Sequence, residues 1–403
     1  MHDKPITTFK LAFTNLKQKP LRTAGLTLIV ALTSFVLFAG GIVSASMKNG
    51  LASMNARLGA DLMIVPVGYD EGVEGILLKG EPTYFYLDRN IEDKLRNVEG
   101  IKTVSSQFFL TSLNQDCCAI PVQFIGFDPG TDFSIQPWIK ESYSGEIKDG
   151  ELIVGHDIQV DENNQLKFFD EKYNVAAKLE QTGTGLDQAV YANMNTLMHL
   201  FDAAKRKGLS FIDDIDPYAS VSSILVKMED GYSLEEVTHN IRSSMDGVQV
   251  IKTKTMITGI ADNLGGLISY IYILAGLFLL VSFITLLIVF SVIVGERKKE
   301  FAILCTLGAT GRKLSGIVLS EAFLICAIGG AAGIFTSGLT VYLFQTLIGD
   351  QLELPYLWPD IGTFIFIALT TVLISLGLGP FATVNSVVRL SRREVYLTLR
   401  EGE

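Results

Sequence analysis

The sequence predicts a membrane protein with four transmembrane α-helices and an α+β extracytoplasmic domain inserted between spans 1 and 2. First, four windows stay apolar for the roughly 20 residues that a helix needs to cross a bilayer. Second, a mostly polar stretch, residues 47–265, separates the first window from the second. Third, a single charged residue, Glu321, lies inside the windows, which cover residues 24–46, 267–294, 317–347 and 361–388.

These windows divide the chain into cytoplasmic, spanning and outer segments. The cytoplasmic segments are an amphipathic helix (1–20), a short connection (295–314) and a tail (389–403). The spans are residues 21–46, 266–294, 315–347 and 361–388. The outer segments are the α+β domain (47–265) and a loop (348–360).

Lysine and arginine residues flank the spans unevenly, and this bias predicts the orientation of the chain. The first 22 residues carry five of them, residues 295–314 carry five and the tail carries four, whereas residues 349–360 carry none. We expect a multi-pass protein of the bacterial cytoplasmic membrane, with both termini inside and the large domain periplasmic or extracellular. Because the first apolar run exceeds the 7–15 residues of a signal peptide, we interpret it as an uncleaved helix.

The outer domain is acidic. Residues 47–265 hold 19 Lys and Arg against 33 Asp and Glu, a net charge of −14, in a chain whose total charge is −10. Such a surface repels a phosphate backbone, so we expect no nucleic-acid partner. It either keeps the domain soluble or attracts cations.

Apolar residues recur every three or four positions near the N-terminus, which predicts an amphipathic helix over Ile6–Lys19. Its apolar face would lie at the membrane interface. Pro20 follows and predicts an elbow before the first span. The apolar stripe consists of Ile6, Phe9, Phe13 and Leu16.

Short apolar runs in the outer domain predict strands, and longer periodic runs predict helices. We expect a helical continuation of the first span over Met47–Leu58 and an acidic, glycine-rich loop over Tyr69–Gly80. A β-α-β-β unit follows from Asp61–Val65, Asp88–Asn97, Ile101–Leu113 and Ile120–Phe127. After a strand at Glu151–Val154 and a strand-to-helix passage at Ala189–Phe201, a β-α-β unit comprises Val221–Met228, Leu234–Met245 and Val248–Thr253. Two such units around an insertion suggest a sheet in two parts.

Three features mark the later spans. The second apolar window would measure about 42 Å as a helix, so it either tilts or projects as a stalk. Gly329 and Gly333 form a G-x-x-x-G pattern, which permits close approach of a neighbouring helix. Pro380 lies within the fourth span and predicts a kink.

A short apolar run lies in the charged connection between the second and third spans. Phe301–Leu307 follows a cluster of charged residues and precedes a Gly-Ala-Thr-Gly turn. A helix of about two turns with an apolar face at the membrane boundary suits docking into a groove on a partner. The candidate docking residues are Glu300, Phe301, Ala302, Ile303, Leu304, Leu307, Gly308 and Ala309.

This segment resembles a known family. The run EFAILCTLGA, Glu300–Ala309, is similar to the signature of the FtsX/MacB/LolC–LolE permeases of ABC transporters. Three further stretches agree with that family in order and spacing, so the resemblance covers nearly the whole chain. They are Leu11–Leu16 with Leu21–Thr23, Ala189–Phe201 and Glu394–Arg400.

The resemblance implies a dimeric permease with a MacB-like periplasmic domain, whose second subunit is either identical or different. Glu300–Ala309 would be a coupling helix seated on a cytoplasmic ABC ATPase. The sequence has no G-x-x-x-x-G-K-[ST] phosphate-binding loop, so ATP and Mg²⁺ would be bound by that separate chain. No Ser/His/Asp or paired-carboxylate pattern suggests catalysis, and we expect a non-catalytic chain with no cofactor of its own.

Cys117 and Cys118 depart from this family's pattern. They are adjacent, at the tip of a turn that the sequence predicts over residues 114–119 of the outer domain. One interpretation is a vicinal disulfide or redox pair, and another is a site for a soft metal or haem. The third is two small residues on a turn. Met194, Met198 and His199 form either a second soft cluster or, at helical spacing, part of the core.

The sequence therefore favours a permease subunit that couples ATP hydrolysis by a separate ATPase to movement of its outer domain and to export or transfer of a substrate. One alternative is a mechanotransmitting regulatory scaffold with no cargo of its own, acting on a periplasmic or extracellular partner. Another is a component of metal, iron or haem transport that uses Cys117 and Cys118.

Overall fold

The computed structural model describes residues 8–112, 118–209, 212–352 and 355–392, and the chain divides into two compact units. Unit 1 contains residues 1–45, 266–345 and 359–403 and is helical. Unit 2 contains residues 46–265 and 346–358 and holds the β-sheets. Unit 2 therefore includes most of the loop that the sequence predicted as a separate outer segment.

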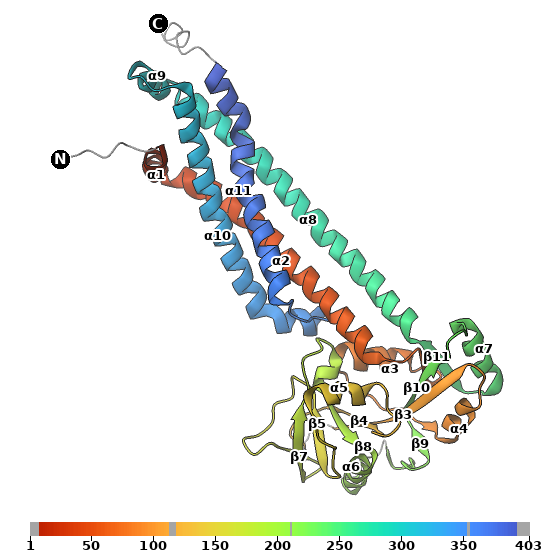
Figure 1. Ribbon diagram of the computed structural model, residues 1–403. Coiled ribbons are helices and arrows are strands. Elements are labelled where there is room, and N and C mark those ends of the chain that lie inside the picture. Colours follow the sequence, from red (N-terminus) through yellow and green to blue (C-terminus); the bar gives the residue numbers. More distant parts are fainter. Residues whose placement is uncertain (1–7, 113–117, 210–211, 353–354, 393–403) are drawn as a thin grey trace. The chain divides into compact units, whose positions relative to one another are not determined.

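Among the described residues, four helices are long and apolar enough to cross a membrane, which confirms the predicted four-span architecture (Figure 1). With 44 residues, α8 is about 66 Å long, roughly twice the thickness of the hydrocarbon core. It therefore extends beyond its apolar window, and α2 likewise includes the predicted continuation over Met47–Leu58. The four helices are α2 (Pro20–Leu58), α8 (Thr253–Glu296), α10 (Gly311–Leu352) and α11 (Ile361–Arg392).

Two short helices complete unit 1. The predicted amphipathic helix is α1 (Thr8–Gln18), with residues 1–7 outside the described part of the chain. Pro20 begins α2, a position where its missing N–H costs no hydrogen bond. The second short helix, α9 (Lys298–Thr306), lies between α8 and α10.

Glycines bring the long helices of unit 1 close together. A Cβ atom on Gly329 would lie 2.7 Å from the backbone oxygen of Thr27, so α10 packs directly on α2 there. One turn later, a Cβ on Gly333 would lie 2.8 Å from the Cβ of Ser34. The predicted G-x-x-x-G packing surface is thus confirmed. Pro380 lies inside α11, as expected.

Unit 2 is built on one nine-stranded sheet with the order β11-β1-β10-β3-β4-β8-β5-β7-β6, plus a two-stranded ribbon β2-β9. One side of the sheet is formed by β1 (Leu62–Pro66), β10 (Ser223–Met228) and β11 (Val248–Lys252). The remaining strands are β3 (Ile101–Thr111), β4 (Gln123–Phe127), β5 (Glu151–Val154), β6 (Gln165–Phe168), β7 (Glu171–Lys178) and β8 (Ala189–Asn193). The ribbon consists of β2 (Leu87–Asp88) and β9 (Ser220–Val221).

The prediction of a sheet in two parts was wrong. Strand β4 pairs in parallel with β8, in register from Gln123 opposite Ala189 to Phe127 opposite Asn193. This pairing joins the inserted strands β5, β6 and β7 to the rest of the sheet. Both strands are fully buried, so neither shows the alternation that would reveal a shared sheet from sequence.

The predicted loop over Tyr69–Gly80 was also wrong. The segment forms α3 (Asp70–Glu74) and a π-helical turn, η1 (Gly75–Lys79). Val73, Ile76 and Leu77 recur at helical spacing and are buried in a hydrophobic cluster of unit 2. Burial of this short stripe outweighs the low helix propensity of Gly72 and Gly75.

Three other helices of unit 2 lie close to their predicted positions, and two helical elements were not predicted. The predicted helices are α4 (Asn90–Arg96), α6 (Met194–Arg206) and α7 (Leu234–Ser244). A capping box between Ser233 and Glu236 starts α7. The helix α5 (Ile135–Ser142) and the 3₁₀ turn η2 (Gly185–Gln188) were not predicted.

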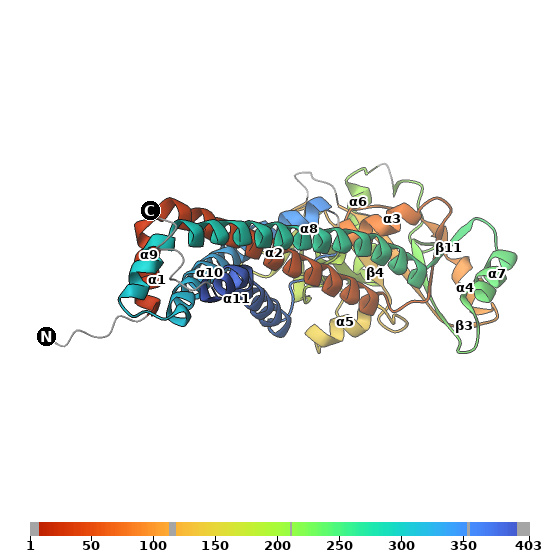
Figure 2. The same cartoon turned by 90° about the horizontal axis from the view of Figure 1, so that it is seen from above.

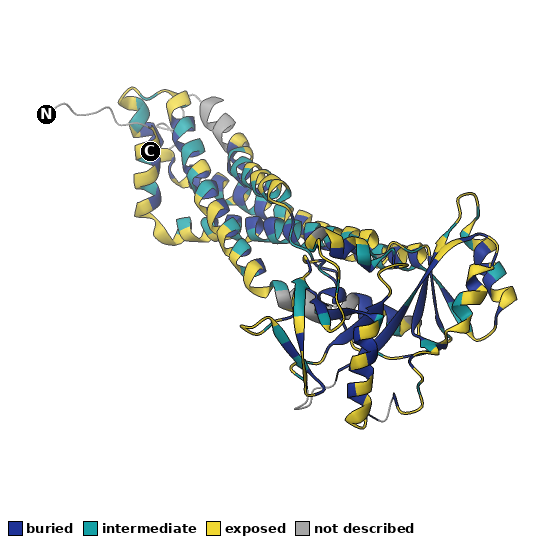
Figure 3. Cartoon of the chain, turned by 60° about the horizontal axis from the view of Figure 1, so that its bottom comes forward, coloured by how far each residue is buried: buried dark blue, intermediate teal, exposed yellow. Residues whose placement is uncertain are grey.

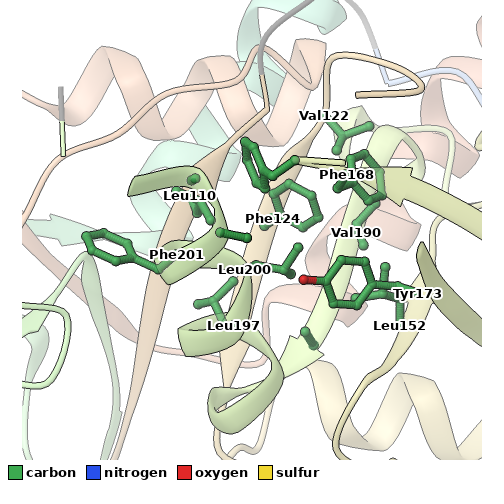
Figure 4. Packing of buried hydrophobic residues seen from close by; sticks show 14 of the residues in the cluster. Leu110, Val122, Phe124, Leu152, Phe168, Tyr173, Val190, Leu197, Leu200 and Phe201 are labelled. Carbon is green, nitrogen blue, oxygen red and sulfur yellow. The ribbon is translucent and has the colours of Figure 1, made fainter. Parts of the chain in front are cut away.

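Hydrophobic clusters fill both faces of the sheet. Figure 4 shows one of them, in which Phe124, Phe168 and Leu197 pack between the strands and α6. Met198 is buried in the same cluster and His199 is exposed, which favours the core interpretation of this helix. Unit 1 differs from this buried sheet, because exposed residues lie along its long helices (Figure 3).

A buried carboxylate organises a turn at the edge of this core. Asp187 accepts hydrogen bonds from the backbone N–H groups of Thr182 and Gly183, at 2.8 and 2.7 Å, and from the Thr182 hydroxyl. Burial raises the pKa of Asp187, and these donors oppose the shift. The same turn also bonds to the 346–358 segment, since the N–H of Tyr356 donates to the Gly183 carbonyl at 2.7 Å.

Candidate coupling site

The helix α9 has a well-defined end. The N–H of Ala309 donates to the carbonyl of Leu304, and the N–H of Gly308 donates to that of Cys305, both at 2.9 Å. This pair of bonds is a Schellman motif, and it requires the left-handed backbone that Gly308 adopts at φ +91°. Leu304 and Ala309 also pack on one hydrophobic cluster of unit 1, and the motif favours such a shared apolar contact. The Gly308-Ala309 pair thus fixes where α9 stops and where α10 can begin.

The eight predicted docking residues all lie on α9 or its C-terminal turn, but they face two ways. Phe301 is buried in the hydrophobic cluster of unit 1, and Leu304 and Ala309 are half-buried against it. Ala302 is buried as well. Ile303 and Leu307 are 61% and 79% exposed. Glu300 and Gly308 are exposed as well. The face available to a partner is therefore made by Ile303 and Leu307, whereas Phe301 anchors the helix.

A buried ion pair lies beneath the anchored face. Arg297, between α8 and α9, places Nη1 2.8 Å from Oε1 of Glu321 on α10. Its Nε lies 2.8 Å from Oε2 of Glu300, and its guanidinium lies 5.0 Å from the centre of the Phe301 ring. Burial lowers the pKa of Arg297, but the two carboxylates raise it by more. One arginine thus ties α9 to both of its neighbouring helices.

The same carboxylate also holds α1. Nδ2 of Asn15 donates to Oε1 of Glu321 at 2.8 Å, so one oxygen accepts bonds from two different elements. Leu16 packs in the same hydrophobic cluster as Phe301. Figure 2 shows α1, α9 and the start of α10 at one end of unit 1. Hydrogen bonds and ion pairs of Asn15, Arg297, Glu300 and Glu321 therefore connect α1, α9 and α10.

The sequence contains a signal for this network. Glu321 is the single charge within the four apolar windows, and a charge inside a span requires a partner. The partners Arg297 and Asn15 were not predicted, because they lie 24 and 306 positions away and neither position is unusual in the sequence.

The predicted cysteine site does not gain support from the structure. Cys117 lies outside the described residues. Cys118 is half-buried against the hydrophobic cluster shown in Figure 4. Within the described ranges, no group of three or more His, Cys, Asp or Glu side chains could hold a metal ion.

Part of the chain matches a known protein family, and two curated relatives are similar to most of it. Residues 272–391 match the family of the FtsX-like permease C-terminal domain. The macrolide export ATP-binding/permease protein MacB of Aggregatibacter actinomycetemcomitans is 24% identical over 351 residues, covering 75% of this chain and 52% of its own length. The chain thus spans about half the length of that relative. The uncharacterized ABC transporter permease MJ1507 of Methanocaldococcus jannaschii is 22% identical over 363 residues, covering 85% of each chain.

Solved structures of two outer domains are also similar to this chain. The periplasmic region of MacB from Actinobacillus actinomycetemcomitans has 12% identity and a TM-score of 0.33, covering 50% of this chain and 94% of that one. The extracellular domain of the transporter YknZ from Gram-positive bacteria has 12% identity and a TM-score of 0.27, covering 48% and 98%.

Four candidate spans, an α/β domain between the first two and an FtsX-like domain over the last three define a membrane permease. The chain is similar to the FtsX/MacB-like permeases of ABC transporters, with residues 272–391 matching the FtsX-like permease C-terminal domain.

Proposed function

We propose that this chain is a permease subunit that receives mechanical work from a separate cytoplasmic ABC ATPase through α9. The observation that carries the proposal is the division of α9 into two faces. Ile303 and Leu307 are exposed, while Phe301 and Arg297 fix the opposite face to unit 1. A short helix anchored on one side and apolar on the other suits docking into a groove.

The buried network would transmit the movement. A displacement of α9 pulls on Arg297, which is bonded to Glu321 on α10 and follows directly on α8. Because α8 is an uninterrupted helix from Thr253 to Glu296, it would carry that displacement along the chain toward the outer domain. In this proposal both termini and α9 are cytoplasmic, in agreement with the lysine and arginine bias. The subunit acts as one half of a dimer, and the cycle exports or transfers a substrate.

The docking face is tested with single charge substitutions. Ile303→Asp and Leu307→Asp place a charge on exposed positions, so the permease should fold normally and lose the ATPase. We expect co-purification with the ATPase to weaken at least about tenfold for each, the size typical of a contact at the centre of an interface. The readout is the affinity of the purified ATPase for the permease in detergent or nanodiscs.

The control is Ile361→Asp, which adds the same charge to an equally exposed apolar residue at the start of α11. It should leave ATPase binding unchanged. Phe301→Asp should instead reduce the amount of folded permease, because Phe301 is buried. Normal ATPase binding by both Ile303→Asp and Leu307→Asp would contradict the proposed docking face.

A further inference from the structure

The elbow formed by residues 8–22, which comprises α1 and the first residues of α2, has one face fixed within unit 1. Ala12 and Leu16 are buried, and Asn15 bonds to Glu321. The hydroxyl of Thr23 donates to the carbonyl of Leu16 at 2.9 Å and holds the corner. These contacts therefore fix the orientation of the adjoining face, which carries Phe9 and Phe13.

That adjoining face is apolar and unpartnered within the described residues. Phe9 and Phe13 are 50% and 57% exposed, and Leu21 is 91% exposed. A soluble surface would rarely present three large apolar side chains within 13 residues. Residues 24–46 of the first apolar window follow at once, so the elbow lies at the depth where the span enters the membrane.

The elbow is also basic. Residues 8–22 contain Lys10, Lys17, Lys19 and Arg22 and no acidic residue. The structure gives none of these four side chains an ion pair with another described residue, and Nη1 of Arg22 is buried without a hydrogen-bond partner there. Other cations are paired, such as Arg96 with Glu92 and Arg206 with Glu171.

We propose that the elbow binds anionic phospholipid. Phe9, Phe13 and Leu21 enter the boundary between headgroups and acyl chains, and the four cations contact the lipid phosphates. Covalent continuity with the first span favours lipid over an acidic protein partner, because the elbow cannot leave the membrane surface. The proposal is independent of the ATPase and is tested without it.

The test uses the full chain in nanodiscs and a fluorophore on the exposed face. Phe13→Trp adds an indole there, and the unmodified chain provides the background from its two native tryptophans. Quenching is compared between brominated phosphatidylglycerol and brominated phosphatidylcholine at equal mole fraction. Each cation near a membrane surface favours anionic lipid about fivefold, so we expect phosphatidylglycerol to be enriched by at least that factor.

Two variants decide the origin of the enrichment. Replacing Lys10, Lys17, Lys19 and Arg22 with Gln should bring the two lipids to equal quenching, as should 1 M salt, where screening shortens to about 3 Å. The matched control replaces four exposed cations at the starts of α9 and α10, Lys298, Lys299, Arg312 and Lys313, with Gln and should keep the enrichment.

Three results would overturn the proposal. Equal quenching by both lipids in the Phe13→Trp chain would show an elbow without preference for anionic lipid. No quenching by either lipid would place the elbow off the membrane. Enrichment that survives the loss of Lys10, Lys17, Lys19 and Arg22 would assign it to other residues.

Discussion

Glu321 in unit 1 and Asp187 in unit 2 are both 1% exposed. Asp187 accepts hydrogen bonds from donors near it in the sequence, whereas the donors to Glu321 are distant. Asp187 takes its donors from Thr182 and Gly183, five and four positions away in the sequence. Glu321 takes its donors from Arg297 and Asn15, which belong to distant segments. A locally satisfied carboxylate shapes one turn, whereas one satisfied from a distance depends on the arrangement of whole helices.

The largest effect is expected from Glu321→Ala. The substitution leaves the Arg297 guanidinium buried without its main partner, which typically costs about 3–5 kcal/mol of unfolding free energy. The measurement is reversible unfolding of the purified permease in detergent. Hydrogen exchange should rise together in α1, α9 and the start of α10.

The control is Glu300→Ala, which removes the exposed carboxylate from the same arginine and should cost about 1 kcal/mol or less. Equal costs for the two substitutions would show that burial of the Arg297–Glu321 pair is unimportant. Replacing both members, Arg297→Met with Glu321→Leu, should recover part of the loss.

A smaller and more local effect is expected from Asp187→Ala. It leaves the N–H groups of Thr182 and Gly183 without an acceptor, at roughly 2–3 kcal/mol in total. Hydrogen exchange should rise at these amides and at Tyr356, whose N–H is bonded to Gly183. Asp187→Asn keeps one acceptor oxygen and should lose less. Exchange that rises throughout unit 2 would disprove the local character of this site.

The smallest effect is expected from Asn15→Ala. Glu321 keeps its bond to Arg297, so the loss is one hydrogen bond to a charged group, about 1.5–3 kcal/mol at most and nearer 1.5 at this half-buried position. Thr14→Ala on the exposed face of the same helix is the control. In a double-mutant cycle, the Asn15 effect should disappear once Glu321 is Ala. An unchanged Asn15 effect in that background would break the link between them.

The sequence predicts best where one residue pattern has one physical cause. Four apolar windows and the Gly329–Gly333 pattern each correspond to a single constraint, and both appear in the structure. The Tyr69–Gly80 segment was mispredicted because its burial depends on a core assembled from distant strands. The parallel pairing of β4 with β8 depends on the same long-range assembly.

The coupling segment shows the same division. Its position and helical character follow from the run Glu300–Ala309, and Gly308 marks its end. Which side faces the subunit does not follow from that run, because Phe301 and Ile303 are both large and apolar. Phe301 faces unit 1 beside the Arg297–Glu321 ion pair, and the sequence does not reveal that pairing.

The shared oxygen of Glu321 also sets an order of events during synthesis. Arg297 is made 24 residues before Glu321, so its cation is present when α10 reaches the membrane. Pairing with it would offset the cost of inserting a lone charge, about 2.5–3.5 kcal/mol near the middle of a span. Asn15 is made 306 residues earlier and has no acceptor until then. The helix α1 thus gains this hydrogen bond only after α10 has been made.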